Sequence, residues 1–127
     1  MVSKIILAIF FIVFNALYFS TYLKKENTLS DFDPKVSFSL VNNGALLIDV
    51  RSPGEYNSGH IKEAINIPYN KIEDNIATFG DLLKNKDKYI VVYCQSGTRS
   101  RIAKKTLKKL GYSNVVNHGG IDSWEKK

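Results

Sequence analysis

The stretch YIVVYCQSGTRSRIA, residues 89–103, decides the fold of this chain. Residues 89–93 are β-branched or aromatic without a break, which predicts a strand buried on both faces. Residues 94–98 are small and polar and include one glycine, which predicts a tight loop. From Arg99 onward, apolar residues recur at helical spacing between lysines and arginines. The stretch therefore predicts a strand, a loop and a helix, with the only cysteine of the chain, Cys94, where the strand ends.

Cys94 occupies a position that favours chemistry. In open α/β sheets ligands bind outside the carboxyl ends of the strands, and a loop that enters a helix directs N–H groups and the positive end of the helix dipole toward them. Such a setting lowers the pKa of a thiol. Gly97 permits a turn with positive φ, and Arg99 can bind an anion. We therefore expect a cysteine nucleophile that attacks an anionic substrate. The alternative is a buried, inert cysteine that packs as a small apolar residue.

Charged residues end a second strand candidate, residues 45–51. Asp49 and Arg51 lie at its carboxyl end, so they could face Cys94 and contact a substrate. The alternative is a structural ion pair that fixes the following loop. His60 could act as a general base, but such a histidine is more often a hydrogen-bonded scaffold residue.

Strands alternate with helices along the chain, which predicts an α/β fold: a small, mostly parallel sheet of about five strands with helices on both faces. Further strands are expected at residues 64–68, where Pro68 indicates a sheet edge, and at 114–117, followed by a turn at 118–120. Apolar residues at helical spacing predict one helix over 69–84.

The N-terminal segment is apolar, and residues 5–23 carry no charge. At about 1.5 Å per residue this segment is just long enough to cross a hydrocarbon core of about 30 Å. We expect residues 1–26 to be a transmembrane anchor or a signal segment. The anchor is favoured because no clear cleavage site follows. Lys24 and Lys25 favour a cytoplasmic domain, but a short N-terminal hydrophobic segment with one leading lysine usually directs export, so we expect an extracytoplasmic or periplasmic domain.

Composition limits the other functions. The formal net charge of +6 could steer anions or rest the domain on anionic lipid, although an ordinary solvated helix face is the more common explanation. The basic residues are not interleaved with aromatic ones, so no nucleic-acid binding is expected. One cysteine excludes an intrachain disulfide, and two histidines argue against a structural zinc site.

Five motifs, in order, resemble the rhodanese (thiosulfate sulfurtransferase) family: DVRSPGEY at 49–56, GHI at 59–61, AINIP at 64–68, YCQSGTRS at 93–100 and GGIDSW at 119–124. The chain is similar to the single-domain members from about residue 29 to its end. The resemblance implies a rhodanese-like domain over 27–127, a loop of the pattern Cys-x-x-Gly-x-Arg, and no metal or organic cofactor.

The resemblance also implies a mechanism. The Cys94 thiolate would take the outer sulfur of thiosulfate as a persulfide and pass it to cyanide, a small thiol or a protein sulfur acceptor. The implied substrate-binding residues are Gln95, Ser96, Gly97, Thr98, Arg99, Ser100 and Arg51, with Asp49 and His60 in support. Many members carry arginine where this chain has Gln95, a loss of charge that bears on the preference for thiosulfate.

Two alternatives stay open. One is a phosphatase or arsenate reductase of the same fold, whose loop in the related families is one residue longer. The other is a non-catalytic module that carries sulfur to a protein partner or only docks it.

Overall fold

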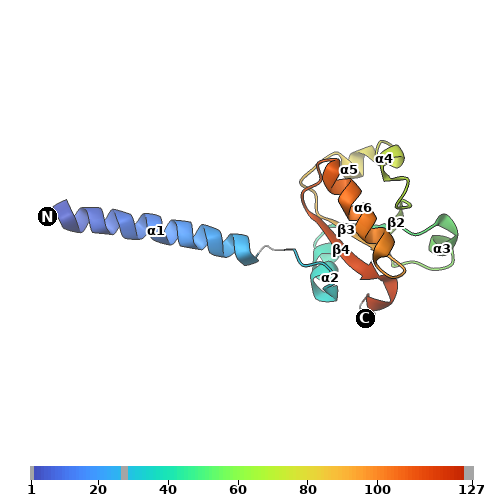
Figure 1. Ribbon diagram of the computed structural model, residues 1–127, viewed down its shortest axis with the longest axis horizontal. Helices are drawn as coiled ribbons and strands as arrows, with labels where there is room; N and C mark the ends of the chain where they lie inside the picture. The colour runs from blue at the N-terminus through green and yellow to red at the C-terminus, as the bar shows by residue number, and fades with distance from the viewer. Residues whose placement is uncertain (1, 27–28, 125–127) are drawn as a thin grey trace.

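Four parallel strands form the centre of the domain, in the order β2-β1-β3-β4. The computed structural model describes residues 2–26 and 29–124, and within the first helix the side chains of residues 3–18. Its elements are shown in Figure 1: α1 (Val2–Glu26), α2 (Pro34–Asn42), β1 (Leu46–Asp49), α3 (Pro53–Asn57), β2 (Ile65–Asn66), α4 (Ile72–Asn75), α5 (Gly80–Leu83), β3 (Ile90–Cys94), α6 (Thr98–Lys109), β4 (Val115–Gly120) and the 3-10 helix η1 (Ile121–Ser123).

The strands are buried on both faces, and their side chains alternate between two cores. Ile48, Val92 and Cys94 point to one core, which α4, α5 and α6 cover. Leu47 and Tyr93 point to the other, which α2, α3 and η1 cover. The predicted α/β fold with a parallel sheet and helices on both faces is therefore confirmed, with four strands in the described part of the chain instead of about five.

Local signals place the helices that flank the site. Asp33 accepts from the N–H groups of Lys35 and Val36 and so caps α2, which begins at a proline. Ser52 and Glu55 form a capping box at the start of α3, directly after β1. These caps fix the first residue of α2 after Asp33 and the first residue of α3 after Ser52.

Two predicted elements differ in the structure. The single helix expected over 69–84 is two short helices, α4 and α5, neither of which has a side-chain cap, and Gly80 begins the second. The turn expected at 118–120 belongs to β4, because the pairing continues past a bulge to join Tyr93 with Gly119 and Cys94 with Gly120.

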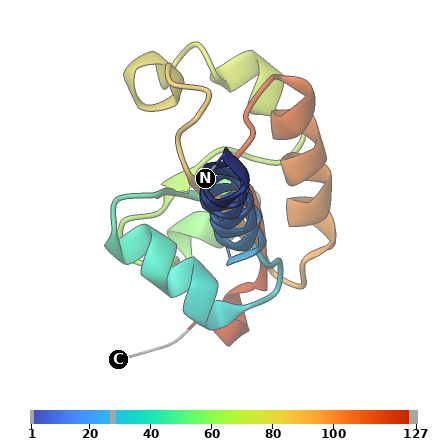
Figure 2. The same cartoon turned by 90° about the vertical axis from the view of Figure 1, so that its left-hand side faces the viewer.

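The apolar N-terminal segment lies in α1, which extends away from the sheet (Figure 1) and is viewed along its length in Figure 2. Its described apolar side chains are exposed, Phe10 by 71%. Among the residues that the structure describes, no helix is both long enough and apolar enough to span a bilayer. The predicted span over 5–23, with its membrane contact, is therefore not supported. The side chains of residues 19–23 lie outside the described part.

Candidate active site

The loop that follows β3 is built around Gly97. Cys94 ends the strand, as the sequence predicts, and α6 begins at Thr98, one residue before the predicted start at Arg99. Gly97 has φ +102°, a conformation that side chains disfavour. A Cβ at this position would lie 3.3 Å from the Cα of Gly119, so β4 leaves little room for one. The loop can therefore close tightly only with glycine here.

The Sγ atom of Cys94 accepts hydrogen bonds from this loop. The Gly97 N–H donates to it at 2.9 Å, and the Ser100 hydroxyl lies 3.3 Å away. Burial by itself would raise the pKa of the thiol. The Ser100 hydroxyl and the N–H groups of Ser100, Gly97 and Ser96 outweigh burial, and the pKa of Cys94 is lowered. This is the direction expected for a thiol at a helix N-terminus.

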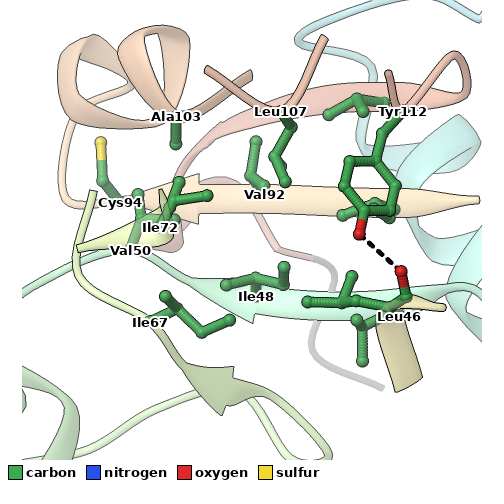
Figure 3. Packing of buried hydrophobic residues seen from close by; sticks show 13 residues of the cluster. Leu46, Ile48, Val50, Ile67, Ile72, Val92, Cys94, Ala103, Leu107 and Tyr112 are labelled. Atoms are coloured by element: carbon green, nitrogen blue, oxygen red, sulfur yellow. Dashed lines mark hydrogen bonds between the residues drawn. The ribbon is translucent and has the colours of Figure 1, made fainter. Parts of the chain in front are cut away.

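Cys94 is also almost completely buried, with 1% of the residue exposed. Figure 3 shows it at one end of the apolar cluster, beside Val50 and Ala103. A sulfur donor therefore reaches Sγ only if neighbouring groups move. The two observations on Cys94 therefore favour different interpretations. Its burial is typical of an inert cysteine in the core, and its lowered pKa is typical of a nucleophile.

Arg99 is held by an acidic residue of α3. Its Nη1 and Nη2 donate to Oε1 and Oε2 of Glu55 at 2.7 and 3.0 Å. These bonds lower the pKa of Glu55 to about 2, although partial burial acts in the opposite direction. Arg99 was expected to bind an anion; in this structure its guanidinium binds Glu55, and an incoming anion would have to share or replace that partner.

Asp49 and Arg51 do not face Cys94, so that interpretation of the sequence is wrong. Asp49 pairs in register with Tyr93, and alternation along the strands places both on the face opposite Cys94. The Arg51 guanidinium donates to the Asp49 carboxylate at 2.7 Å and to the Gly59 carbonyl at 2.7 Å. Both residues are buried, and together they fix the loop at Gly59, the structural alternative.

His60 and the outer loop residues lie at the surface. The His60 ring stacks on Tyr56 at 3.7 Å, and its Nδ1 is 2.9 Å from the Tyr56 carbonyl, which is the scaffold arrangement. Exposed side chains follow Cys94 at Gln95, Ser96 and Thr98. Ser100, in contrast, is buried under the loop.

Two residues near the site, and a third on the opposite face of the sheet, were not identified from the sequence. Glu55 binds Arg99, and its place in the capping box after β1 is the signal that could have drawn attention to it. Asn117 donates to the Gly97 carbonyl at 3.3 Å and accepts from the Gly119 N–H at 2.9 Å. The Tyr93 hydroxyl accepts from the Ile61 N–H at 3.1 Å, and burial raises its pKa. Nothing local marks the last two.

A cavity of about 360 Å³ opens beside Arg99. Its walls are mostly apolar, and Lys71 and Arg99 are the two cationic residues that line it; the other lining residues are Val50, Ser52, Pro53, Pro68, Tyr69 and Asn70. A small organic molecule with an anionic end would match these walls.

Comparison with known proteins shows the family to which the chain belongs. Residues 38–127 match the family model of the rhodanese-like domain. The chain is 35% identical to a putative mitochondrial thiosulfate sulfurtransferase of Schizosaccharomyces pombe, over 84% of this chain and 82% of that protein. It is 40% identical to the thiosulfate sulfurtransferase PspE of Escherichia coli, over 58% of this chain and 68% of that protein. A solved rhodanese with anions from E. coli superposes with a TM-score of 0.59 at 36% identity, covering 66% of this chain and 95% of the other. The chain therefore belongs to the family of rhodanese-like domains.

Proposed function

We propose that this protein is a sulfurtransferase that moves sulfane sulfur from an anionic donor, such as thiosulfate, to a thiol or cyanide. The observation that carries the proposal is the hydrogen bonding of Cys94 Sγ to the Gly97 N–H and the Ser100 hydroxyl. These groups stabilise a negative charge on sulfur, which is what both the thiolate and a persulfide require. Relatives named thiosulfate sulfurtransferase support the same reaction class.

The first step is an attack of the Cys94 thiolate on the outer sulfur of thiosulfate. A new S–S bond forms to Cys94 while the S–S bond of thiosulfate breaks, and its electron pair leaves with sulfite. The loop N–H groups then face the persulfide. Arg99, partly released from Glu55, would neutralise the donor as it enters.

The second step returns the enzyme to its starting state. A thiolate or cyanide attacks the outer persulfide sulfur, the new S–S or S–C bond forms, and the electron pair of the broken S–S bond returns to Cys94. No net oxidation occurs, so neither step calls for an organic or metal cofactor. The cavity beside Arg99 would admit an organic thiol with an anionic end.

A steady-state assay tests this proposal. Thiosulfate and cyanide should give thiocyanate and sulfite with ping-pong kinetics, because the two substrates bind in separate half-reactions. The Cys94→Ser variant should lose the activity. Thiocyanate formation that survives in Cys94→Ser would rule out the persulfide route. Turnover of an aryl phosphate or arsenate, with no sulfur transfer, would favour the phosphatase or arsenate reductase alternative.

A non-catalytic module is the second candidate, and the burial of Cys94 is the observation that favours it. Such a module would bind a protein partner saturably but show negligible turnover with small acceptors. The division into an N-terminal segment, residues 1–26, and a domain over 27–127 stays a prediction, as does an extracytoplasmic location. Protease accessibility in intact cells measures the location.

A further inference from the structure

Asp31 and Phe32, which precede α2, lie against strand β4. The Phe32 N–H donates to the Asn117 carbonyl at 2.8 Å, and the Asn117 N–H donates to Oδ1 of Asp31 at 2.9 Å. Because β4 is the last strand of the described sheet, these bonds occupy part of an edge that would otherwise be unpaired. We name Asp31 and Phe32 the N-terminal clip.

The N-terminal clip also contacts the helix that begins at the catalytic loop. Nζ of Lys104, on α6, donates to both carboxylate oxygens of Asp31 at 2.7 Å. Asp31 therefore joins β4 to α6; Gly97 directly precedes α6 and lies close to Gly119 of β4.

The Phe32 ring touches the loop directly. A Cβ built on Gly97 would lie 3.3 Å from its Cε1, and one built on Gly119 would lie 2.9 Å from its Cδ1, so the ring covers both glycines. Phe32 has φ +60°, a left-handed conformation that is unfavourable for a residue with a side chain. The residue is nevertheless 61% exposed. Such an unfavourable backbone conformation persists only where surrounding contacts maintain it. For Phe32 these are the hydrogen bond to Asn117 and the packing of the ring on Gly97 and Gly119, and Gly97 belongs to the loop of the site.

Asn117 continues the connection from the clip to the sulfur. Its Nδ2 donates to the Gly97 carbonyl at 3.3 Å, and the Gly97 N–H donates to Cys94 Sγ at 2.9 Å. Phe32 and Asn117 thus contact the same residue whose N–H meets the thiol.

We propose that the N-terminal clip is a positioning element of the active site: Asp31 and Phe32 hold Gly97 where its N–H reaches the Cys94 sulfur. This deepens the proposed function, on which it rests for its role in catalysis. Its principal readout, the ionisation of Cys94, does not require sulfur transfer.

The first test uses Phe32→Gly in the full chain. Glycine accepts φ +60° without strain and keeps the N–H that donates to Asn117, so the substitution removes the ring while the backbone can keep its conformation. Because Cys94 is the only cysteine, the ultraviolet absorbance of thiolate reports its titration once the signal of the seven tyrosines, measured in Cys94→Ser, is subtracted; no reagent has to reach the thiol. We expect the titration midpoint to rise by about half a pH unit. An unchanged midpoint would overturn the proposal.

The matched control is Asp33→Ala. Asp33 directly follows Phe32 and caps α2, so the substitution should lower the melting temperature; the hydrogen bonds described for its side chain go to Lys35 and Val36 of α2 and to neither β4 nor α6. We expect a wild-type midpoint. A rise equal to that of Phe32→Gly would mean that any loosening near α2 shifts the thiol, and the positioning role would be lost.

Asp31 provides a second pair of variants. Asp31→Ala removes the acceptor for the Asn117 N–H and should raise the midpoint, whereas Asp31→Asn keeps an acceptor and should restore most of it. Equal shifts in both variants would assign the effect to the charge near Lys104 and remove Asp31 from the clip.

Activity separates this proposal from the proposed function. In an active enzyme, Phe32→Gly should lower kcat about two- to threefold at neutral pH with little change in the KM for thiosulfate, because less thiolate is present. A wild-type chain without sulfur transfer, but with the expected midpoint shift in Phe32→Gly, would contradict the proposed function and keep the clip. Sulfur transfer by the wild type, together with an unchanged titration midpoint in Phe32→Gly, would support the proposed function and overturn the clip.

Discussion

The hydroxyl of Ser100 lies between two acceptors, 3.3 Å from the Sγ of Cys94 and 3.1 Å from the Gly97 carbonyl oxygen. Ser100 is buried in the first turn of α6, and its hydroxyl is the largest of the influences that lower the pKa of the thiol. Its single proton can be donated to the Gly97 carbonyl or to the sulfur, and donation to the sulfur favours the thiolate.

Replacing Ser100 by alanine should raise the pKa of Cys94 by about one unit, because the thiolate loses a hydrogen-bond donor while burial stays. The thiolate absorbance across a pH titration measures this. Ser113→Ala, an exposed serine beyond the end of α6, is the control and should leave the curve unchanged. A Ser100→Ala curve that matches the wild type would show that the backbone N–H groups suffice.

Glu55 should give the chain a measurable loss of stability in acid. Its pKa falls from 4.5 to about 2 on folding, so the pairing with Arg99 stabilises the fold fully above pH 4.5 and is lost as the pH falls toward 2. Both side chains are about one-third exposed, so the contribution stays below about 1 kcal/mol. Urea unfolding of the wild type and of Glu55→Gln should differ more at pH 6 than at low pH. A difference that does not change with pH would contradict this.

Gly97→Ala should destabilise the protein more than Gly44→Ala does. The two glycines have similar φ values, +102° and +99°, so the backbone strain is comparable at about 1 kcal/mol. Nothing lies within 4 Å of a Cβ at Gly44, whereas one at Gly97 would press on Gly119 and Phe32. Chemical denaturation gives both values. Equal losses of unfolding free energy in the two variants would mean that the loop accommodates a Cβ at Gly97 without an energetic penalty, and would contradict the prediction.

Arg51→Ala should be among the most destabilising single changes, at about 3–5 kcal/mol, because it leaves the Asp49 carboxylate buried without its cation. Thermal unfolding measures the loss. If Arg51→Ala folds at low temperature, its Cys94 titration should match the wild type, since the pair lies on the other face of the sheet. A shifted titration would return Arg51 to the active site.

The part of the site that is formed by residues close together in the chain could be predicted from the sequence. The apolar run up to Tyr93, the small residues after it and the helical spacing beyond Arg99 are neighbours in the chain, so their pattern places Cys94 at a strand end beside a helix. The prediction of one helix over 69–84 was wrong. The apolar residues reach the core from two short helices, and neither helix has a side-chain cap, while Gly80 disfavours a continuous helix.

Relations between distant residues could not be predicted. The side of the sheet on which Asp49 lies depends on its register with Tyr93, and strand pairing leaves no mark on either segment alone. Asp31 meets Asn117 across 86 residues, and neither belongs to a motif with a known chemistry. The burial of Cys94 follows from how closely the loop packs, which residue type does not determine.

Intact mass measurement after incubation with thiosulfate tests the central claim most directly. The account predicts a single adduct of about 32 Da, one sulfur atom, on Cys94; cyanide should remove it, and Cys94→Ser should not form it. A wild-type chain that stays unmodified at saturating thiosulfate, with its fold intact, would contradict the account and leave the buried thiol as part of the core.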